Sequence, residues 1–411
     1  MPGPLLSCRI HYNQYNQYNQ CYIDFVDIDA RDLSKSVKER LAIPVPMFDS
    51  FADPEPHNFP TDKWLLSSAL QKLVRRGLPE RAVEIALALH ALDPHYLPKR
   101  LPIIAFEDVG IGNLEACFDT LHLFGTRRFP AKTGDLDQRK LLANLVYRLA
   151  RSVKSRAACD ILCLALANSE LKTATELANS GAENLISLAA DRKAADVTRA
   201  LALYLLCGRS VGNKGPYRTL PRFNADVLNA LIEKLELPSV IAWMLIKGRN
   251  RTGLAAMLPL AWEAIAEGVA GLEVKRLPDD DSKALAEKQI LGVPACAADM
   301  YTRVGRQAIM WFSEVVKREY RGFFEAFPEI INHSNLLGMA IFHFEGSRLG
   351  RWLENETIAK YREHVERAEL QALGVPDPES HQELYQILET ERQLLWQIRK
   401  AHLYVAFGTD K

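Results

Sequence analysis

The chain has 411 residues, 48% of them hydrophobic and 25% charged, an ordinary globular composition with room for one large helical assembly or two to three domains. Lysines plus arginines number 51, and aspartates plus glutamates also number 51, so no global field draws the protein to nucleic acid or anionic lipid. Any such contact therefore requires a local patch of charge.

The seven cysteines are scattered and odd in number, which favours a reducing compartment over a disulfide framework. Cys159 and Cys163 have the spacing of two ligands on one helix face, but no second pair or nearby histidine completes a metal site. The sequence predicts neither a metal nor a cofactor. The first residues lack a basic start, and no apolar run approaches about 18 residues, so we expect a cytoplasmic protein with no membrane contact.

Residues 1–60 are expected to be irregular, with short strands and a proline-rich linker. Apolar residues alternate over residues 22–28, and because only this part of the chain shows alternation, strands are predicted nowhere else. Residues 12–20 repeat Tyr-Asn-Gln three times, which fits either an aromatic surface for bases or a low-complexity expansion without function.

The rest of the chain is predicted to be all-α, a multi-helix array that is collar-like or α-solenoid-like. A first helix ends at Gly77, a second runs over Pro79–Leu92, and a third starts at Asp93 and stops near Gly110. Pro102 lies inside the third helix, where a kink or break is expected.

Residues 64–121 carry an order of motifs that resembles the helical domain following the ATPase core in RarA/MgsA-type replication-associated AAA+ proteins. The matching positions are Ser68, Ala69, Leu70, Lys72, Arg75, Gly77, Ala82, Arg100, Leu101, Ile104, Ala105, Glu107, Asp108 and Gly110. The match covers roughly one-seventh of the chain. The resemblance implies a collar that holds a homo-oligomer together beside DNA-handling machinery.

The motor of that family is missing from this chain. No G-x-x-x-x-G-K-[ST] loop occurs in the 411 residues, so no cradle for nucleotide phosphates is expected. ATPase activity is therefore not carried over from the resemblance.

Glu107 and Asp108 are adjacent carboxylates near a helix end. The sequence favours a structural role, in which they hold neighbouring N–H groups or pair with Arg100, over a catalytic role, because adjacent side chains on a helix point in different directions.

Four regions are expected: residues 1–60, a helical collar-like domain at 61–207, a second helical region at 208–353, and a C-terminal helical hairpin or partner-binding arm at 354–411. Helices at 354–373 and 379–403 form that hairpin.

Two glycine-flanked basic loops in the second region are suited to phosphate. Residues 208–222 offer Arg209, Lys214, Arg218 and Arg222. Residues 247–253 offer Lys247, Arg249 and Arg251. Either loop also fits a solvated connector without function.

A dense polar cluster follows at residues 299–306. Asp299 and Arg303 are four residues apart and Arg303 and Arg306 three apart, so each pair shares a helix face. The cluster fits either an arginine pair that grips a phosphate or a partner's carboxylate, or a helix start in which Asp299 caps the helix or pairs with Arg303. The second interpretation is the one we expect.

Taken together, the sequence predicts a non-catalytic accessory of DNA replication or recombination that binds DNA, replication proteins or both. One alternative is a nucleic-acid-processing enzyme whose site combines Asp299, Arg303 and Arg306 with Glu107 or Asp108 in one cleft. Another is a structural scaffold of a multi-protein assembly.

Overall fold

The computed structural model describes residues 37, 39–41, 59–124, 136–168, 176–177, 179–206, 225–249, 272–277, 288–345 and 350–408. These residues form the expected multi-helix array. The first helices are α2 (Lys63–Arg76), α3 (Pro79–Leu92), α4 (Leu97–Ile104), α5 (Leu114–Phe124), α6 (Leu136–Arg151) and α7 (Ala157–Asn168). Next come α9 (Ala182–Ala190), α10 (Asp196–Leu206), α11 (Ala225–Lys234) and α12 (Ser239–Arg249). The last are α15 (Arg303–Glu319), α16 (Arg321–Ala326), α17 (His333–Glu345), α18 (Glu356–Gln371), α19 (Pro378–Thr390) and α20 (Arg392–Phe407).

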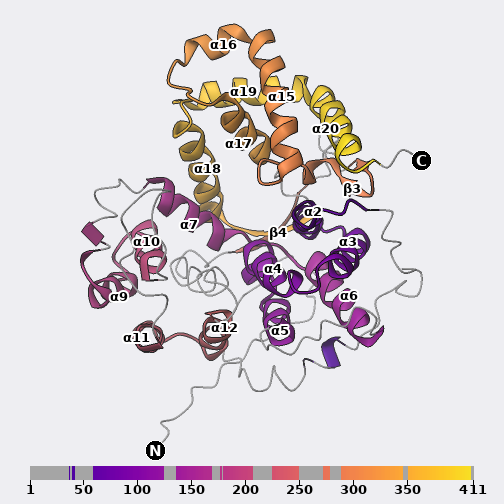
Figure 1. Ribbon diagram of the computed structural model, residues 1–411. Helices are drawn as coiled ribbons and strands as arrows, with labels where there is room; N and C mark the ends of the chain where they lie inside the picture. The colour runs from indigo at the N-terminus through magenta and orange to yellow at the C-terminus, as the bar shows by residue number, and fades with distance from the viewer. Residues whose placement is uncertain are drawn as a thin grey trace, which may run out of the picture.

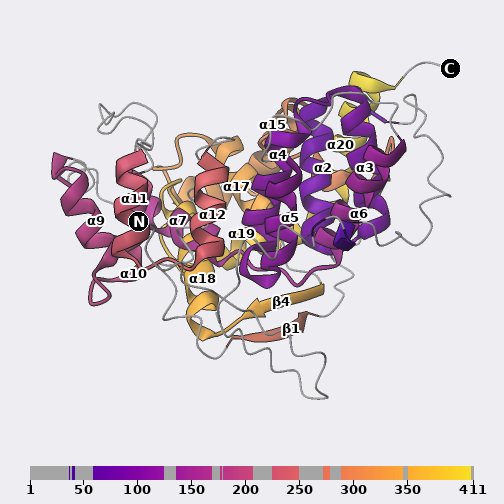
Figure 2. The same ribbon diagram turned by 90° about the horizontal axis from the view of Figure 1, so that it is seen from below.

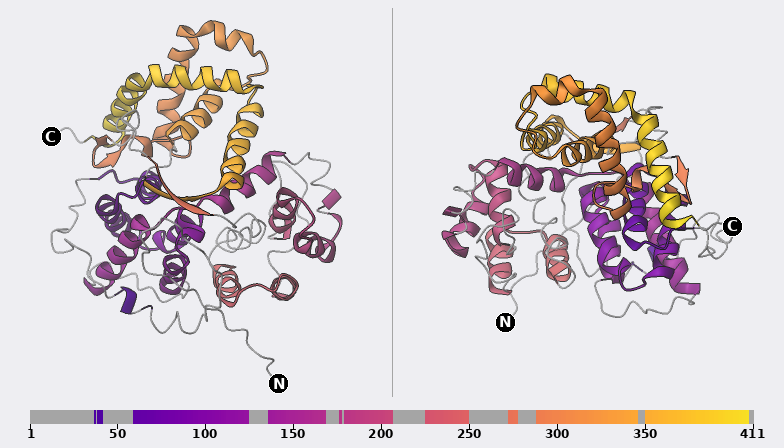
Figure 3. Two further views of the ribbon diagram at one scale, coloured as in Figure 1. Left: turned by 180° about the vertical axis from the view of Figure 1, so that it is seen from behind. Right: turned by 45° about the horizontal axis from the view of Figure 1, so that its top comes forward.

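The helices lie in two main groups. Figure 1 shows α15 to α20 as a bundle above the layer that contains α2 to α7, with α9 to α12 to one side of that layer. The view from behind gives the same arrangement (Figure 3). Among the helices that the structure describes, none is both long and apolar enough to cross a membrane.

The local signals of the first helices are confirmed. α2 ends at Gly77, whose φ of 71° lies in the left-handed region that glycine adopts without strain, and α3 spans Pro79–Leu92. The third helix breaks after Pro102: α4 stops at Ile104 and continues as a π-helical turn, Ala105–Val109. Proline removes one backbone donor from the helical ladder, which is the physical reason for a break there.

The expectation that strands occur only in the first 60 residues is wrong. β1 (Glu273–Leu277) pairs antiparallel with β4 (Gly350–Glu354), and β2 (Gln289–Ile290) pairs with β3 (Val293–Pro294). Figure 2 shows β1 and β4 side by side beneath the helices. These strands are too short to show clear alternation, and β1 finds its partner far along the chain. Residues 12–20 and 22–28 lie outside the described residues.

The C-terminal region is also more divided than predicted. The helix expected at 379–403 is two helices, α19 and α20, which meet at Glu391. α18 packs on α7 and α20 packs on α15, so the described C-terminal helices are built into the molecule instead of forming a separate arm.

Two apolar cores fill the molecule. The larger one includes Leu65, Leu70, Phe106 and Phe118, and the smaller one, within the C-terminal bundle, includes Phe312 and other side chains of α15 to α20. Between the cores lies a layer of buried charge, which we call the polar seam. Its members are Lys72, Arg75 and Arg76 of α2 together with Asp108, Arg156, Asp299, Glu345 and Arg399.

The polar seam joins α2 to the C-terminal bundle. Lys72 forms an ion pair with Asp299, which also accepts a hydrogen bond from Ser68 Oγ at 3.0 Å. Arg76 Nη2 donates to the backbone oxygen of Glu345 at 2.7 Å. The carboxylate of Glu345 in turn pairs with Arg399 on α20, Nη2 to Oε2 at 2.8 Å.

The first prediction concerns the ion pair between Lys72 and Asp299, which replaces the expected pair of Asp299 and Arg303. Both side chains are less than a tenth exposed, so Asp299→Ala leaves a buried ammonium unpaired. We expect it to lower the free energy of unfolding by about 3 to 5 kcal/mol. Arg303→Ala, at an exposed position, is the control and should change it by less than about 0.5 kcal/mol. Equal losses in urea titrations of the two variants would contradict the arrangement.

A second prediction follows from the carboxyl groups of the seam. Burial alone raises the pKa of Asp299, but Lys72 and Ser68 hold it below its ordinary value of 3.8. Burial likewise opposes, and Arg75 and Arg156 overcome, so that the pKa of Asp108 is also lowered. Since both folded-state values lie below the unfolded ones, the stability they contribute is fully present above about pH 4 to 5 and is lost as the pH falls through the folded-state values.

The corresponding measurement is a series of urea titrations between pH 6 and pH 3. Lys72→Met with Asp299→Leu replaces the pair by apolar side chains of similar size, a change that buried ion pairs often tolerate. We expect stability of this variant to fall less steeply below pH 4 than that of the wild type, by up to one proton or about 1.4 kcal/mol per pH unit. Parallel curves would show that Asp299 is not an acid-sensitive group.

Candidate functional site

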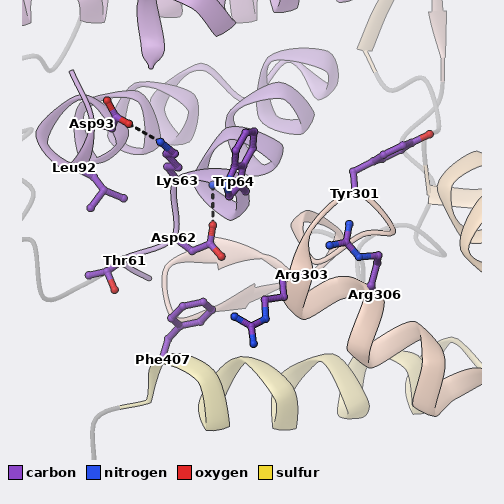
Figure 4. Close-up of a pocket in the computed structure, with 10 residues that line it drawn as sticks. All are labelled: Thr61, Asp62, Lys63, Trp64, Leu92, Asp93, Tyr301, Arg303, Arg306 and Phe407. Atoms are coloured by element: carbon purple, nitrogen blue, oxygen red, sulfur yellow. Dashed lines mark hydrogen bonds and ion pairs between the residues drawn. The ribbon is translucent and has the colours of Figure 1, made fainter. Parts of the chain in front are cut away.

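The described residues surround an open cavity of about 840 Å³ where the starts of α2 and α15 meet the ends of α3 and α20. Figure 4 shows Arg303 and Arg306 on α15 across the cavity from Asp62 and Trp64, with Phe407 below Thr61. The lining residues are Thr61, Asp62, Lys63, Trp64, Leu92, Asp93, Tyr301, Arg303, Arg306 and Phe407. We call this cavity the Trp64 pocket.

The α2 side of the Trp64 pocket is held by local interactions. Asp62 caps the helix, its Oδ1 accepting from the backbone N of Trp64 at 2.7 Å and of Leu65 at 3.1 Å. Lys63 Nζ lies 2.8 Å from Asp93 Oδ2. The hydrogen bond from Lys63 lowers the pKa of Asp93, so these two opposite charges largely cancel.

Trp64 presents an aromatic surface to solvent. Its side chain is 57% exposed, although one edge packs against Tyr96 with ring centroids 5.3 Å apart. Leu65, Ala69 and Leu70 bury the apolar side of α2, and the helical period puts Trp64 on the opposite side. An exposed indole off the apolar side of a helix is a feature more typical of contact surfaces than of cores.

The α15 side of the pocket carries two guanidinium groups. Thr302 is the N-cap of α15: its Oγ1 accepts from Gly305 N at 3.1 Å and donates to Asp299 O at 3.0 Å. Gly305 is needed there because a Cβ would meet Asp299 O at 2.0 Å. Arg303 and Arg306 are exposed, and neither has an ion-pair or hydrogen-bond partner among the described residues.

The arrangement favours an anion over a cation. Two unpaired guanidinium groups lie at the N-terminal turn of α15, where backbone N–H groups and the helix dipole add positive potential. The acids that line the pocket are Asp62, whose Oδ1 caps α2, and Asp93, which is paired with Lys63. Guanidinium groups bind phosphate and carboxylate through two parallel hydrogen bonds, so phosphate oxygens are suitable ligands.

Asp299 does not line the Trp64 pocket. It bonds to Lys72 and Ser68 in the polar seam, and its Oδ1 accepts from Tyr301 N at 3.0 Å. The prediction that it pairs with Arg303 is therefore wrong. The sequence could not show this, because Lys72 is 227 residues away in the chain.

Glu107 and Asp108 have the structural role that we expected, but Arg100 is not their partner. Asp108 accepts from Arg75 Nε at 2.7 Å and from Arg156 Nη1 at 2.9 Å. Arg100 bonds to Gln71 instead. Asp299, Glu107 and Asp108 thus lie in the interior network, apart from the arginines of the pocket.

Two further groups could suggest chemistry but have structural explanations. Burial lowers the pKa of Lys154 to about 7, and its Nζ donates to backbone oxygens at the end of α6, including Ala150 O at 2.7 Å. Cys159 lies 4.0 Å from Cys163, Sγ to Sγ; the Cys163 thiol and burial hold the pKa of Cys159 well above its ordinary value. A neutral thiol is a poor nucleophile. Within the described residues, no cluster of three or more His, Cys, Asp or Glu is arranged to hold a metal.

The predicted basic loops contribute less than the sequence suggested. Arg209, Lys214, Arg218, Arg222 and Arg251 lie outside the described residues. Lys247 and Arg249 belong to the last turn of α12 instead of a loop, and Lys247 Nζ lies 5.9 Å from the ring centroid of Trp243.

A second cavity, of about 600 Å³, lies between α9 and α11. Its charged residues are three acids, Glu183, Asp226 and Glu233, and one base, Lys234. This excess of acidic groups disfavours an anionic ligand, so the Trp64 pocket is the better candidate.

Comparison of the chain with protein-family models, with curated proteins and with solved structures gives no match. The resemblance of residues 64–121 to the RarA/MgsA collar therefore depends on the quoted motif residues alone. Several of them, including Lys72, Arg75 and Asp108, are members of the polar seam.

Proposed function

We propose that the protein is a non-catalytic accessory that binds nucleic acid at the Trp64 pocket. The observation that carries the proposal is the pairing of two unpartnered guanidinium groups, Arg303 and Arg306, with the exposed indole of Trp64 across an open cavity. Phosphate and base are the two parts of a nucleotide, and this pocket offers a suitable surface to each.

Charge supports this proposal over a general electrostatic role. The whole chain has no net charge, so a polyanion has no reason to bind at an arbitrary place. The pocket offers Lys63, Arg303 and Arg306 against Asp62 and Asp93, and the pair of Lys63 with Asp93 leaves the two arginines as its uncompensated cations.

The proposed role in DNA replication or recombination comes from the resemblance to the RarA/MgsA collar. In such a role the chain would bind DNA, a replication protein or further copies of itself without hydrolysing nucleotide. The site residues favour this accessory role over the enzyme hypothesis, because Asp299 and Asp108 are each held by cations in the interior. A general base must reach the proton it removes, and neither carboxylate lines the pocket.

The salt dependence of binding tests the role of the arginines. Binding of a fluorescein-labelled single strand of about 20 nucleotides is followed by anisotropy between about 50 and 200 mM salt, the range over which phosphate contacts are most visible. Arg303→Gln with Arg306→Gln should reduce the log–log slope by about 1.4 to 1.8, since each lost phosphate contact removes about 0.7 to 0.9.

The matched control removes two other exposed cations, Lys360 and Arg392, which are paired with Glu356 and Glu389. Lys360→Gln with Arg392→Gln should leave the slope of the wild type unchanged. The same slope for both double variants, or no binding by the wild type, would refute the proposal.

A separate prediction concerns the indole. Trp64→Ala should weaken binding by about 1 to 3 kcal/mol, the usual contribution of one base stacked on an aromatic side chain. Trp64→Phe keeps an aromatic face and should retain much of the affinity. Because Trp64 is more than half exposed, thermal melting of both variants should stay close to that of the wild type. Equal affinities for Trp64→Ala and the wild type would exclude stacking on Trp64.

A further inference from the structure

The exposed face of α15 continues from the Trp64 pocket along the C-terminal bundle. Its exposed residues are Arg303, Arg306, Gln307, Met310, Trp311, Glu314, Lys317 and Arg318. We call them the α15 stripe. The stripe begins at the two arginines of the pocket, and Figure 1 shows α15 running from there towards α16.

Helical geometry places the α15 stripe on one surface. Its members follow one another at intervals of one or three residues, which keeps them on one side of a helix with 3.6 residues per turn. The opposite side is buried, with Val304, Ala308, Phe312 and Val316 in the cores. From Arg303 to Arg318 the stripe is about 22 Å long at 1.5 Å per residue.

The composition of the stripe is unusual for a solvated helix face. Trp311 is 59% exposed and its neighbour Met310 is 49% exposed. Cations lie on both sides of these apolar residues, and Glu314 is the one acid of the stripe. Arg318 is also paired with the adjacent Glu319, Nη2 to Oε1 at 3.0 Å, at a highly exposed position.

We propose that the α15 stripe extends the Trp64 pocket into a track for single-stranded nucleic acid, with Trp64 and Trp311 as two stacking surfaces. This inference rests on the proposed function and adds the class of ligand. Phosphates would lie against Arg303 and Arg306 between the two indoles and against Lys317 beyond Trp311.

A single strand fits this surface better than a duplex. The faces of paired bases are covered by their neighbours in a duplex, whereas an unpaired base offers a face to an indole. The stretch from Arg303 to Trp311 is about 12 Å, which equals three to four phosphates at the 3.4 Å spacing of one duplex strand and fewer in an extended strand. The alternation of aromatic and cationic residues therefore matches the spacing of bases and phosphates.

An acidic peptide is the competing occupant, since it would also satisfy the cations. Amphipathic peptides bind in apolar grooves that receive several anchors. The α15 stripe is the convex face of one helix, and its apolar part consists of Met310 and Trp311. This geometry favours a strand that crosses the helix face and stacks its bases over a peptide that needs a groove.

The experiment compares wild type, Trp311→Ala and Trp311→Phe in binding to a labelled oligothymidylate of about 16 nucleotides and to a blunt duplex of equal length. We expect Trp311→Ala to weaken single-strand binding about fivefold or more, Trp311→Phe to retain most of it, and duplex binding to be weaker and indifferent to both changes. Ile331→Ala, at an apolar position that is 97% exposed and off the stripe, is the control and should have no effect.

The outcomes separate this inference from the proposed function. If Arg303→Gln with Arg306→Gln weakens binding but Trp311→Ala does not, the track is wrong and the pocket proposal stands. If the wild type binds no single strand, both are wrong. If the wild type instead binds a synthetic acidic amphipathic peptide and Trp311→Ala abolishes that binding, the stripe is a protein-binding surface and the track is overturned.

Discussion

The structure depends on how three cations of one helix are buried. Lys72, Arg75 and Arg76 are all on α2, and each is less than a tenth exposed. A buried charge without a partner costs several kcal/mol, so each must meet an acceptor supplied from elsewhere in the chain. Those acceptors are Asp299, Asp108 and the backbone of Glu345. The C-terminal bundle is therefore held to α2 by geometry that apolar packing alone does not specify.

The same constraint creates the Trp64 pocket. Lys72 binds Asp299, and Thr302, three residues further on, starts α15, so the ion pair brings the first turn of α15 beside the first turn of α2. Arg303 and Arg306 then face solvent next to Trp64. The interior charges of the seam are compensated, whereas the arginines at its edge are not. Stability and ligand binding are thereby assigned to different residues of one short segment.

The sequence predicts what neighbouring residues determine and misses what distant ones determine. Pro79–Leu92 was predicted with its bounds, because Pro79 starts the helix and Gly77 ends the one before it. The cluster at 299–306 was also recognised, but its local pair of Asp299 with Arg303 does not form. The partner that wins, Lys72, lies on another helix, where a buried ammonium has more to lose than an exposed guanidinium. The pairing of β1 with β4 is missed for the same reason: the strands are short and far apart in sequence.

The missed site residue, Trp64, did leave a signal in the sequence. Leu65, Ala69 and Leu70 define the apolar side of α2, and a tryptophan opposite them has no core to fill. The neutral composition of the chain conceals the pocket in a similar way, because equal totals say nothing of which charges are paired. Lys72 and Arg75 are compensated by acids in the interior, while Arg303 and Arg306 find no such partner among the described residues. A chain without net charge can thus present a local surface for phosphate, and its binding would be confined to that surface because nothing else in the overall charge attracts a polyanion.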